Sequence, residues 1–289
     1  MDPSPLVTVY IPTHNRCELL KRAISSVYSQ TYKNIELLIV DDGSSDGTAS
    51  WLKNLTHESI DIKTFRQETA QGACVARNIA LKHARGDFVA GLDDDDEFLP
   101  QRISYLIEHY DPAYAFICTG FLWDYGNRAR AVDNTAMTIN FTDQLNYNYA
   151  TNQVLVDIGR LKAINGFDKN LVACQDYDTW TRLIKKFGPA KRLAGTSYVI
   201  HRDENLARIS SPINWLNGHR QFMHKHENSM SEKNKQNQEF RRLIANRETL
   251  GPVTFIKQLR AGLFKQKLRY FLSSNFKGLA EIRRRLISK

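Results

Sequence analysis

Residues 93–97 of this 289-residue sequence are four aspartates and a glutamate, directly after the apolar segment 87–92. Carboxylates this close together raise one another's pKa unless a cation neutralises them. In an extended backbone, Asp93 and Asp95 point to the same side. Their oxygens suit a hard divalent ion, Mg²⁺ or Mn²⁺, which binds through one or two carboxylates and substrate phosphates. A solvated acidic loop is the alternative, but the position after a buried strand favours a metal–diphosphate site.

A second acidic pair, Asp176 and Asp178, precedes apolar residues at helical spacing from Trp180 to Phe187. This pattern predicts a helix with Asp176 at its N-terminus, where aspartate is favoured over alanine by about 1 kcal/mol as a cap. On the residues alone, capping is the favoured role of Asp176. Trp180 lies on the apolar face, where a core position is more common than stacking on a sugar.

The first hundred residues alternate between apolar, β-branched runs and segments with helical spacing. The runs 7–11, 35–40, 60–65 and 87–92 predict strands, and 19–27, 46–52 and 75–83 predict helices. Such alternation indicates an α/β fold with a mostly parallel sheet covered by helices, in which ligands bind beyond the carboxyl ends of the strands. The polar segments 12–16, 41–45, 67–72 and 93–96 all follow strands, so we expect them along one edge of the sheet.

Several classes of protein are disfavoured by the sequence. It contains no G-x-G-x-x-G after the first strand and no G-x-x-x-x-G-K-[ST], and the acidic run lacks the glycine of an EF-hand loop. The four cysteines form no C-x-x-C pair, which disfavours a zinc site or a disulfide framework. No apolar run is long enough to span a membrane, and the first residues do not resemble a signal peptide. We therefore expect a cytoplasmic protein.

Six short segments together carry a family resemblance. They are 9–16 (VYIPTHNR), 29–32 (SQTY), 36–48 (ELLIVDDGSSDGT), 76–81 (ARNIAL), 86–87 (GD) and 92–96 (LDDDD). In this order they resemble the motifs of family 2 glycosyltransferases with the GT-A fold.

The resemblance implies a site for a nucleotide-sugar and a divalent ion, Mn²⁺ or Mg²⁺. The residues implied for the nucleotide, usually uridine, are Pro12, Thr13, His14, Arg16, Asp42 and Arg77. Residues 93–95 match the D-x-D motif of the family. Asp93 and Asp94 are expected to contact the ribose and the metal shell, and Asp95 to bind the ion directly. His201 is expected near the metal, with a surface histidine as the alternative.

The resemblance also changes the interpretation of Asp176. Inverting members of the family carry an E-D-x-D-x-W-like string about 80 residues after D-x-D, and its second acid is the catalytic base. Asp176 takes that position here, while Gln175 replaces the first glutamate. The string 173–180 (ACQDYDTW) resembles bacterial O-antigen glucosyl- and galactosyltransferases. This implies inverting transfer of a hexose from a UDP-sugar to a lipid-diphosphate-linked saccharide, GlcNAc-diphosphate-undecaprenol, forming a β linkage.

The formal net charge of +9 lies entirely in residues 251–289, which contain ten Lys or Arg residues and one acid. Apolar residues recur there at helical spacing, first from Phe255 to Leu263 and then from Phe276 to Leu286. Such basic amphipathic helices bind anionic membranes, bind nucleic acid, or pack on the rest of the protein. The resemblance favours the inner face of the cell membrane as a peripheral site, and no nucleic-acid partner is expected.

These observations predict a catalytic domain at 1–250 and a basic helical tail at 251–289. Within the domain we expect a nucleotide-sugar-binding half to about residue 110, an acceptor-binding half at about 111–213 and a helical part at about 214–250. Residues 140–153 are rich in Asn, Gln and Tyr without a clear period. Either a mobile acceptor loop or irregular surface accounts for them.

Overall fold

The computed structural model describes residues 4–150, 153–202 and 212–276. Its elements are β1 (Val7–Thr13), α1 (Cys17–Tyr28), β2 (Ile35–Asp41), α2 (Thr48–Leu52), β3 (Asp61–Arg66), α3 (Ala73–His83), β4 (Phe88–Gly91), β5 (Asp96–Phe98), α4 (Arg102–Glu108), β6 (Ile117–Asp124), β7 (Ala129–Val132), β8 (Met137–Ile139), α5 (Phe141–Asn146), β9 (Leu155–Asp157), α6 (Ile158–Ala163), α7 (Gln175–Phe187), β10 (Ala190–His201), α8 (Pro212–His226), η1 (Glu227–Ser229), α9 (Glu232–Ala245), α10 (Pro252–Leu259) and α11 (Phe264–Asn275).

The chain divides into two compact units. Unit 1 comprises Met1–Gln144, Asn148–Asn170 and Gln175–Ala207, and unit 2 comprises Leu145–Tyr147, Leu171–Cys174 and Arg208–Lys289. The predicted boundary at residue 250 falls inside unit 2, and the domain division of the sequence analysis stays a prediction.

Unit 1 is built on one sheet with the strand order β3-β2-β1-β4-β9-β6-β10-β5. The strands β3, β2, β1 and β4 are parallel, as their apolar, β-branched sequences predict. The other half is mixed, because β9 runs antiparallel to β4 and β6, and β5 runs antiparallel to β10. Strand β5 contains only Asp-Glu-Phe, so its sequence carries no strand pattern.

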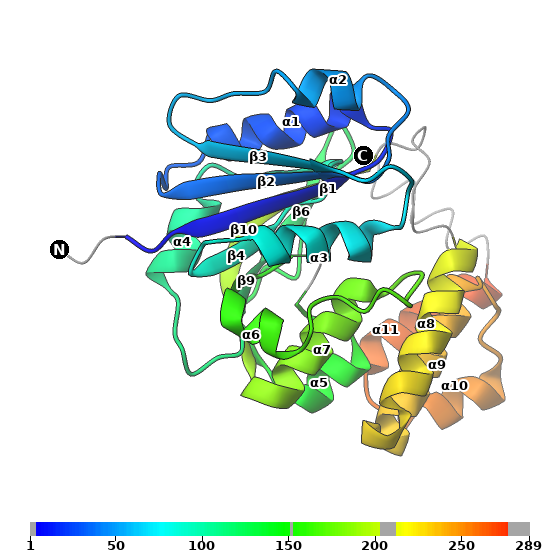
Figure 1. Ribbon diagram of the computed structural model, residues 1–289. Helices are drawn as coiled ribbons and strands as arrows, with labels where there is room; N and C mark the ends of the chain where they lie inside the picture. Colours follow the sequence, from blue (N-terminus) through cyan, green and yellow to red (C-terminus); the bar gives the residue numbers. More distant parts are fainter. Residues whose placement is uncertain (1–3, 151–152, 203–211, 277–289) are drawn as a thin grey trace. The chain divides into compact units, whose positions relative to one another are not determined.

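Helices cover both faces of this sheet (Figure 1). Alternate residues of β1 point to opposite faces, as the period of a strand requires. Val9 packs in a core with α1 and α4, whereas Tyr10 packs in the core formed with α3, α6 and α7. Trp180 of α7 lies in the second core and is 1% exposed, which confirms the predicted core position.

The carboxyl ends of the parallel strands lie along one edge of the sheet. Thr13 at the end of β1 is in register with Asp41 at the end of β2, and Asp41 with Arg66 of β3. The N–H of Leu92, after β4, donates to the carbonyl of Tyr10 in β1. The polar segments after these four strands therefore meet at one edge, as predicted.

Unit 2 contains the helices α8 to α11. Its core includes Phe240, Leu243 and Leu250, with Phe255 of α10 and Tyr270 of α11 packed against them. Lys267 of α11 is fully buried, and its ammonium donates to Asn237 Oδ1 over 2.8 Å and to the carbonyl of Gln258 over 2.7 Å. The first predicted amphipathic helix, from Phe255 to Leu263, is present in part as α10, which ends at Leu259. The second, from Phe276 to Leu286, lies outside the described residues apart from Phe276.

Among the helices in the described ranges, none combines the length and the hydropathy needed to cross a bilayer.

Candidate active site

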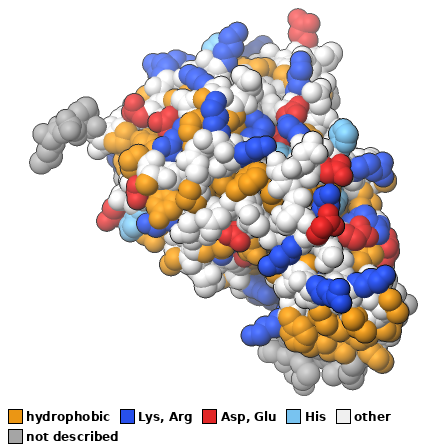
Figure 2. All heavy atoms as spheres, turned by 90° about the horizontal axis from the view of Figure 1, so that it is seen from below, with side chains coloured by type: hydrophobic (Ala, Val, Ile, Leu, Met, Phe, Trp, Pro, Cys, Tyr) orange, Lys and Arg blue, Asp and Glu red, His pale blue; other side chains and the backbone are white. Residues whose placement is uncertain are grey.

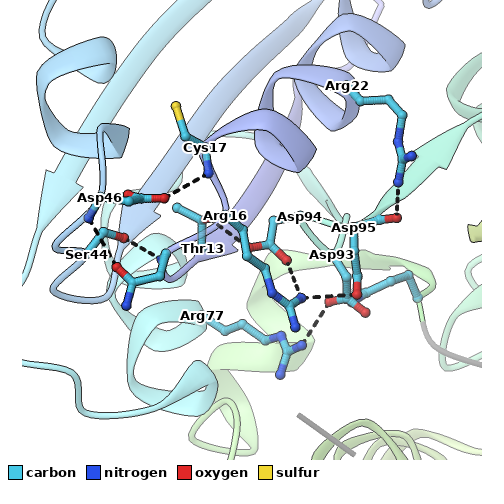
Figure 3. Close-up of polar contacts among 12 residues, drawn as sticks. Thr13, Arg16, Cys17, Arg22, Ser44, Asp46, Arg77, Asp93, Asp94 and Asp95 are labelled. Atoms are coloured by element: carbon cyan, nitrogen blue, oxygen red, sulfur yellow. Dashed lines mark hydrogen bonds and ion pairs between the residues drawn. The ribbon is translucent and has the colours of Figure 1, made fainter. Parts of the chain in front are cut away.

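The loops after β1 and β2 are held together by polar contacts at the carboxyl edge (Figure 3). Asn15 has a positive φ of 53°, and its N–H donates to Ser44 Oγ over 2.8 Å. Its side-chain oxygen in turn accepts the N–H of Ser45 over 2.7 Å. His14 Nδ1 lies 2.6 Å from the carbonyl oxygen of Asp42. These contacts fix the backbone beside Pro12, Thr13 and Arg16, which the sequence analysis assigned to the nucleotide.

Asp42 anchors the loop after β3. Its carboxylate accepts the backbone N–H groups of Gln71 and Gly72, each over 2.7 Å, and a hydrogen bond from the side chain of Gln67. Asp42 is only 5% exposed. It therefore shapes the loop 67–72, and its contact with the nucleotide stays a prediction.

The acidic residues form a turn, in which the N–H of Asp96 donates to the carbonyl of Asp93 over 3.1 Å. The expectation of an extended backbone at 93–95 was wrong, whereas the placement of Asp93 and Asp95 on the same side stays a prediction. Asp93 binds Arg77 and Asp95 binds Arg16, each over 2.9 to 3.0 Å, so the two carboxylates have different partners. The turn arises because β4 ends at Gly91 and β5 begins at Asp96, which leaves four residues between them.

Arg16 bridges two carboxylates of this turn (Figure 3). Its Nη1 lies 3.0 Å from Asp94 Oδ1 and 3.0 Å from Asp95 Oδ2. Asp94 also accepts the hydroxyl of Thr13 over 2.7 Å. Burial raises the pKa of Asp94 to about 6, although the charge of Arg16 acts in the opposite direction. Asp95 is the most exposed of Asp93, Asp94 and Asp95, with 34% of its side chain accessible.

Asp93 is supported from three parts of the chain, which are α3, the segment before β9, and β10. Arg77 of α3 donates to Asp93 Oδ1 over 2.9 Å, and Gln153 Nε2 donates to the same oxygen over 3.0 Å. The backbone N–H of Asp93 donates to the hydroxyl of Tyr198 in β10 over 3.2 Å. Tyr198 is also hydrogen-bonded to Asp96, whose pKa is raised by burial and by the nearby charges of Asp95 and Asp93.

Arg77 links the acidic turn to the start of α7. Its Nη2 donates to Asp93, and its Nη1 donates to Gln175 Oε1 over 2.9 Å. Gln175 is the first residue of α7, and Asp176 follows it. The structure thus brings the predicted nucleotide residue Arg77 and the predicted base into one neighbourhood.

Asp176 is mostly buried near the N-terminus of α7, with a minor part of its surface accessible. Asn148 Nδ2 donates to Asp176 Oδ2 over 2.8 Å. Burial raises the pKa of Asp176 to about 6, while the backbone N–H of Tyr177 and the charge of Arg77 oppose this shift. A carboxylate with this pKa is ionised at neutral pH and accepts a proton readily, which suits a general base.

Asp178 has a different role from Asp176. It is fully buried, and its Oδ2 accepts from Arg182 Nε over 2.7 Å. The remaining guanidinium nitrogens of Arg182 donate to the carbonyls of Ile164 and Gly166, each over 2.7 Å. Asp178 therefore orients an arginine that fastens α7 to the preceding loop.

His201 lies at the end of β10 between two carboxylates. Its Nε2 is 2.6 Å from Glu97 Oε1, and its Nδ1 is 3.1 Å from Asp124 Oδ2. Both ring nitrogens are thus engaged, and a metal bound by His201 would replace one of these contacts. Its assignment as a metal ligand stays a prediction.

The donor set fits a hard cation in part. Carboxylate oxygens of Asp93 and Asp95 are ligands that Mn²⁺ and Mg²⁺ accept, and each ion also takes oxygens from a bound diphosphate. Within residues 4–150, 153–202 and 212–276, no three His, Cys, Asp or Glu side chains are grouped closely enough to hold an ion by themselves.

Three residues of the site were missed from sequence: Asn148, Gln153 and Tyr198. Asn148 and Gln153 lie in the Asn- and Gln-rich segment 140–153, which was interpreted as a mobile acceptor loop or irregular surface. Amide-rich composition was the only local signal for either residue. Tyr198 gave none, because its partner Asp93 is 105 residues away in sequence.

Residues 8–166, more than half of the chain, match the family described as Glycosyl transferase family 2. The putative colanic acid biosynthesis glycosyl transferase WcaA of Escherichia coli K12 is 30% identical over 254 residues, covering 83% of this chain and 88% of that protein. The Escherichia coli UDP-Glc:alpha-D-GlcNAc-diphosphoundecaprenol beta-1,3-glucosyltransferase WfgD is 33% identical over 188 residues, covering 62% and 70%.

Among solved structures, residues 1–349 of TarS from S. aureus, in complex with UDP-GlcNAc, superpose with a TM-score of 0.65 at 19% identity. The likeness covers 93% of this chain and 81% of that one. At this identity it concerns the fold.

Proposed function

This chain belongs to glycosyl transferase family 2 and is a glycosyltransferase with the GT-A fold, and we propose that it transfers a hexose from a UDP-sugar to a lipid-diphosphate-linked saccharide. The observation that carries the proposal is the position of Arg77 between Asp93 and Gln175. It connects the acidic turn, proposed for the nucleotide diphosphate, with the helix that begins beside Asp176. Donor and base are thereby assigned to neighbouring parts of unit 1.

The proposed donor site comprises the residues at the carboxyl edge. They are Pro12, Thr13, His14, Arg16, Asp42, Arg77, Asp93 and Asp94. The tight contacts between the loops after β1, β2 and β3 support a pre-formed site, and the guanidinium of Arg16 offers a positive charge to phosphate. The relative WfgD is named for UDP-glucose, which supports a UDP-hexose donor here.

We assign the divalent ion to Asp95, with Asp93 and His201 as further candidates. When bound, Mn²⁺ or Mg²⁺ supplies positive charge that stabilises the nucleoside diphosphate as it leaves. Asp95 is the best placed of the three because its carboxylate is the most exposed of the turn. Arg16 binds both Asp94 and Asp95, so its guanidinium keeps the contact with Asp94 if the Asp95 carboxylate turns to bind an ion.

The proposed chemical step is a direct displacement at the anomeric carbon. A hydroxyl oxygen of the acceptor forms the new bond to that carbon, while the bond from the carbon to the diphosphate oxygen breaks and its electron pair leaves with UDP. Asp176 takes the hydroxyl proton as general base. Attack from the face opposite the diphosphate inverts the anomeric centre, so an α-linked donor gives a β linkage.

The proposed acceptor is GlcNAc-diphosphate-undecaprenol, in the synthesis of O-antigen or a related surface polysaccharide. The names of WcaA and WfgD support this pathway class, and WfgD is named for that acceptor. Glucose and galactose are the two hexoses that the string 173–180 supports.

We place the protein at the inner face of the cell membrane, bound through its basic C-terminal segment. The helices α10 and α11 expose apolar residues, among them Val253, Ile256 and Phe264, which are 68%, 65% and 56% exposed. Lys257 and Lys265 are exposed on the same helices. Figure 2 shows hydrophobic side chains gathered in one surface patch with Lys and Arg side chains along its border. Each basic residue near an anionic surface contributes about 1 kcal/mol.

The test of the activity is a donor panel on a synthetic GlcNAc-diphosphate-lipid acceptor. UDP-glucose, UDP-galactose, UDP-GlcNAc and GDP-mannose are each incubated with the full chain and Mn²⁺, and products are separated and identified by mass spectrometry. We expect one UDP-hexose to give product, with a β linkage by NMR, and EDTA to stop the reaction. An α-linked product, or transfer from GDP-mannose alone, would contradict the proposal.

A further inference from the structure

The carboxylate of Asp176 is held by a side chain from a segment that precedes it by 28 residues. Asn148 Nδ2 donates to Asp176 Oδ2 over 2.8 Å. The carboxylate is also held by the N-terminal turn of α7, through the backbone N–H groups of Tyr177 and of Asp176 itself. Donors from two parts of the chain therefore fix the direction in which Asp176 points.

The amide of Asn148 has its own support. Gln144 Nε2 donates to Asn148 Oδ1 over 2.9 Å, and Gln144 is fully buried on α5. An amide oxygen that accepts from Gln144 leaves the amide nitrogen of Asn148 to face Asp176. The hydrogen bonds run from buried Gln144 through Asn148 to Asp176, and each residue donates to the next one.

We propose that Asn148 is the positioning residue of Asp176 and that Gln144 sets the orientation of Asn148. This inference rests on the proposed role of Asp176 as base. A donor on Oδ2 holds the carboxylate in one rotamer and so fixes the direction in which it faces the acceptor hydroxyl. It also stabilises the ionised form that a general base requires.

The charged and titratable groups around Asp176 do not replace this contact. Arg77 and Asp93 act on it with opposite signs, and Tyr10 and Cys74 are neutral neighbours with pKa values raised by burial. Arg77 is hydrogen-bonded to Asp93 and Gln175. Asn148 donates a hydrogen bond to Asp176, whereas Arg77 and Asp93 act on it only through the electrostatic effect of their charges.

The experiment compares N148A and N148D with two matched variants, N170A and N170D. Asn170 also donates its side-chain amide to an aspartate, Asp168, over 3.1 Å, but this pair is exposed and outside the proposed site. The readouts are kcat and donor KM across pH, UDP binding by calorimetry and the melting temperature, all on the full chain. Q144L tests the orienting contact.

For N148A we expect kcat to fall about ten- to a hundredfold, because a misplaced reacting group costs this much. Donor KM and UDP binding should change little. The acidic limb of the kcat profile should move to higher pH by roughly one unit, since a donor to the ionised form is lost. N148D should move it further, because its added carboxylate repels Asp176, and Q144L should act in the same direction more weakly.

A wild-type kcat and pH profile in N148A would overturn the inference, and so would equal effects in N148A and N170A. If N148A does not fold, N148D is isosteric and carries the test. D176N separates this inference from the proposed function. Transfer by D176N would refute the base and the inference together, whereas an inactive D176N with a fully active N148A would refute the inference alone.

Discussion

Nη2 of Arg77 lies 2.9 Å from Oδ1 of Asp93, and this ion pair joins helix α3 to the acidic turn. The other terminal nitrogen of Arg77 donates to Gln175 over the same distance. A guanidinium presents donors in a rigid plane, so one arginine keeps the turn and the start of α7 at a fixed separation. A lysine has a single ammonium group and does not reproduce this arrangement.

The first prediction therefore concerns R77K. We expect kcat/KM to fall at least about tenfold, because the geometry between donor site and base is loosened. Stability should fall by about 1–2 kcal/mol as charged hydrogen bonds are lost. Steady-state kinetics and urea unfolding measure the two effects. R85K is the control, since Arg85 also binds two side chains at once, here the acids Glu36 and Asp61, outside the proposed site. Equal activity loss in both variants would count against a role for Arg77 in the site.

The second prediction is the pH dependence of turnover. Burial raises the pKa of Asp176 to about 6, and a base works only when unprotonated, so kcat should fall as pH drops through about 6. The pKa of Asp94 is also raised to about 6. Donor KM is therefore measured beside kcat, because protonation of Asp94 is expected to alter donor binding. A kcat that stays constant down to pH 4.5 would argue against Asp176 as base.

The third prediction is that D176N is inactive yet melts at a higher temperature than the wild type at pH 7. A carboxyl whose pKa is raised in the folded state binds more protons there than in the unfolded chain. The wild type therefore loses free energy of unfolding as pH rises from about 4 to 6, because Asp176 ionises. The amide of D176N does not ionise, so the variant avoids this loss. The difference should disappear at pH 4, where Asp176 is protonated. Calorimetry at pH 4 and 7 checks this, and a lower melting temperature at pH 7 would oppose it.

The fourth prediction concerns the ion and the pairing of Arg16 with Asp95. Removing divalent ions with EDTA should stop transfer, and Mn²⁺ should restore it. In R16Q, without donor present, Mn²⁺ should bind more tightly, because the guanidinium no longer competes for Asp95. UDP-sugar should bind R16Q more weakly. Mn²⁺ titration by electron paramagnetic resonance and UDP calorimetry measure the two. D95N should lose Mn²⁺ binding, and unchanged binding in D95N would exclude Asp95 as the ligand.

The fifth prediction tests the membrane surface with the double variant V253E/I256E. Truncation at residue 250 is unsuitable, since Phe255 and Tyr270 pack against Phe240 in the core of unit 2. We expect the wild type to co-sediment with phosphatidylglycerol vesicles and the double variant to remain in solution. The control is V172E, because Val172 is 48% exposed but lies outside α10 and α11. Equal co-sedimentation of wild type and double variant would refute the assignment. Binding to DNA in a shift assay would support the nucleic-acid alternative instead.

The sequence predicted the parallel half of the sheet and its polar edge well, for a physical reason. Strands β1 and β2 are buried on both faces, so most of their residues are apolar, which is the pattern of a buried strand. The end of each strand is marked by polar residues such as His14 and Asp42. Helix α7 was predicted for a similar reason, because its buried stripe repeats at the helical period.

The support of the acidic side chains was not predictable in the same way. Gln153, Tyr198 and Asn148 act through partners that are 60, 105 and 28 residues away. No local period marks such contacts, because they depend on which strands become neighbours. The turn at residues 93–96 was mispredicted because β5, which follows it, is an acidic three-residue strand. Its identity as a strand comes from pairing with β10.

The pairing of β5 with β10 also affects when, during synthesis, the surroundings of the acidic turn are complete. The turn carrying Asp93 emerges from the ribosome about 100 residues before Tyr198, whose hydroxyl accepts its backbone N–H. Domains fold as units, and long-range pairings form late. A nascent chain ending before β10 thus already contains the whole D-x-D sequence but lacks the strand that completes its surroundings. We therefore expect UDP to bind only after residue 201 has left the exit tunnel, because β10 is the last strand of the sheet to be synthesised.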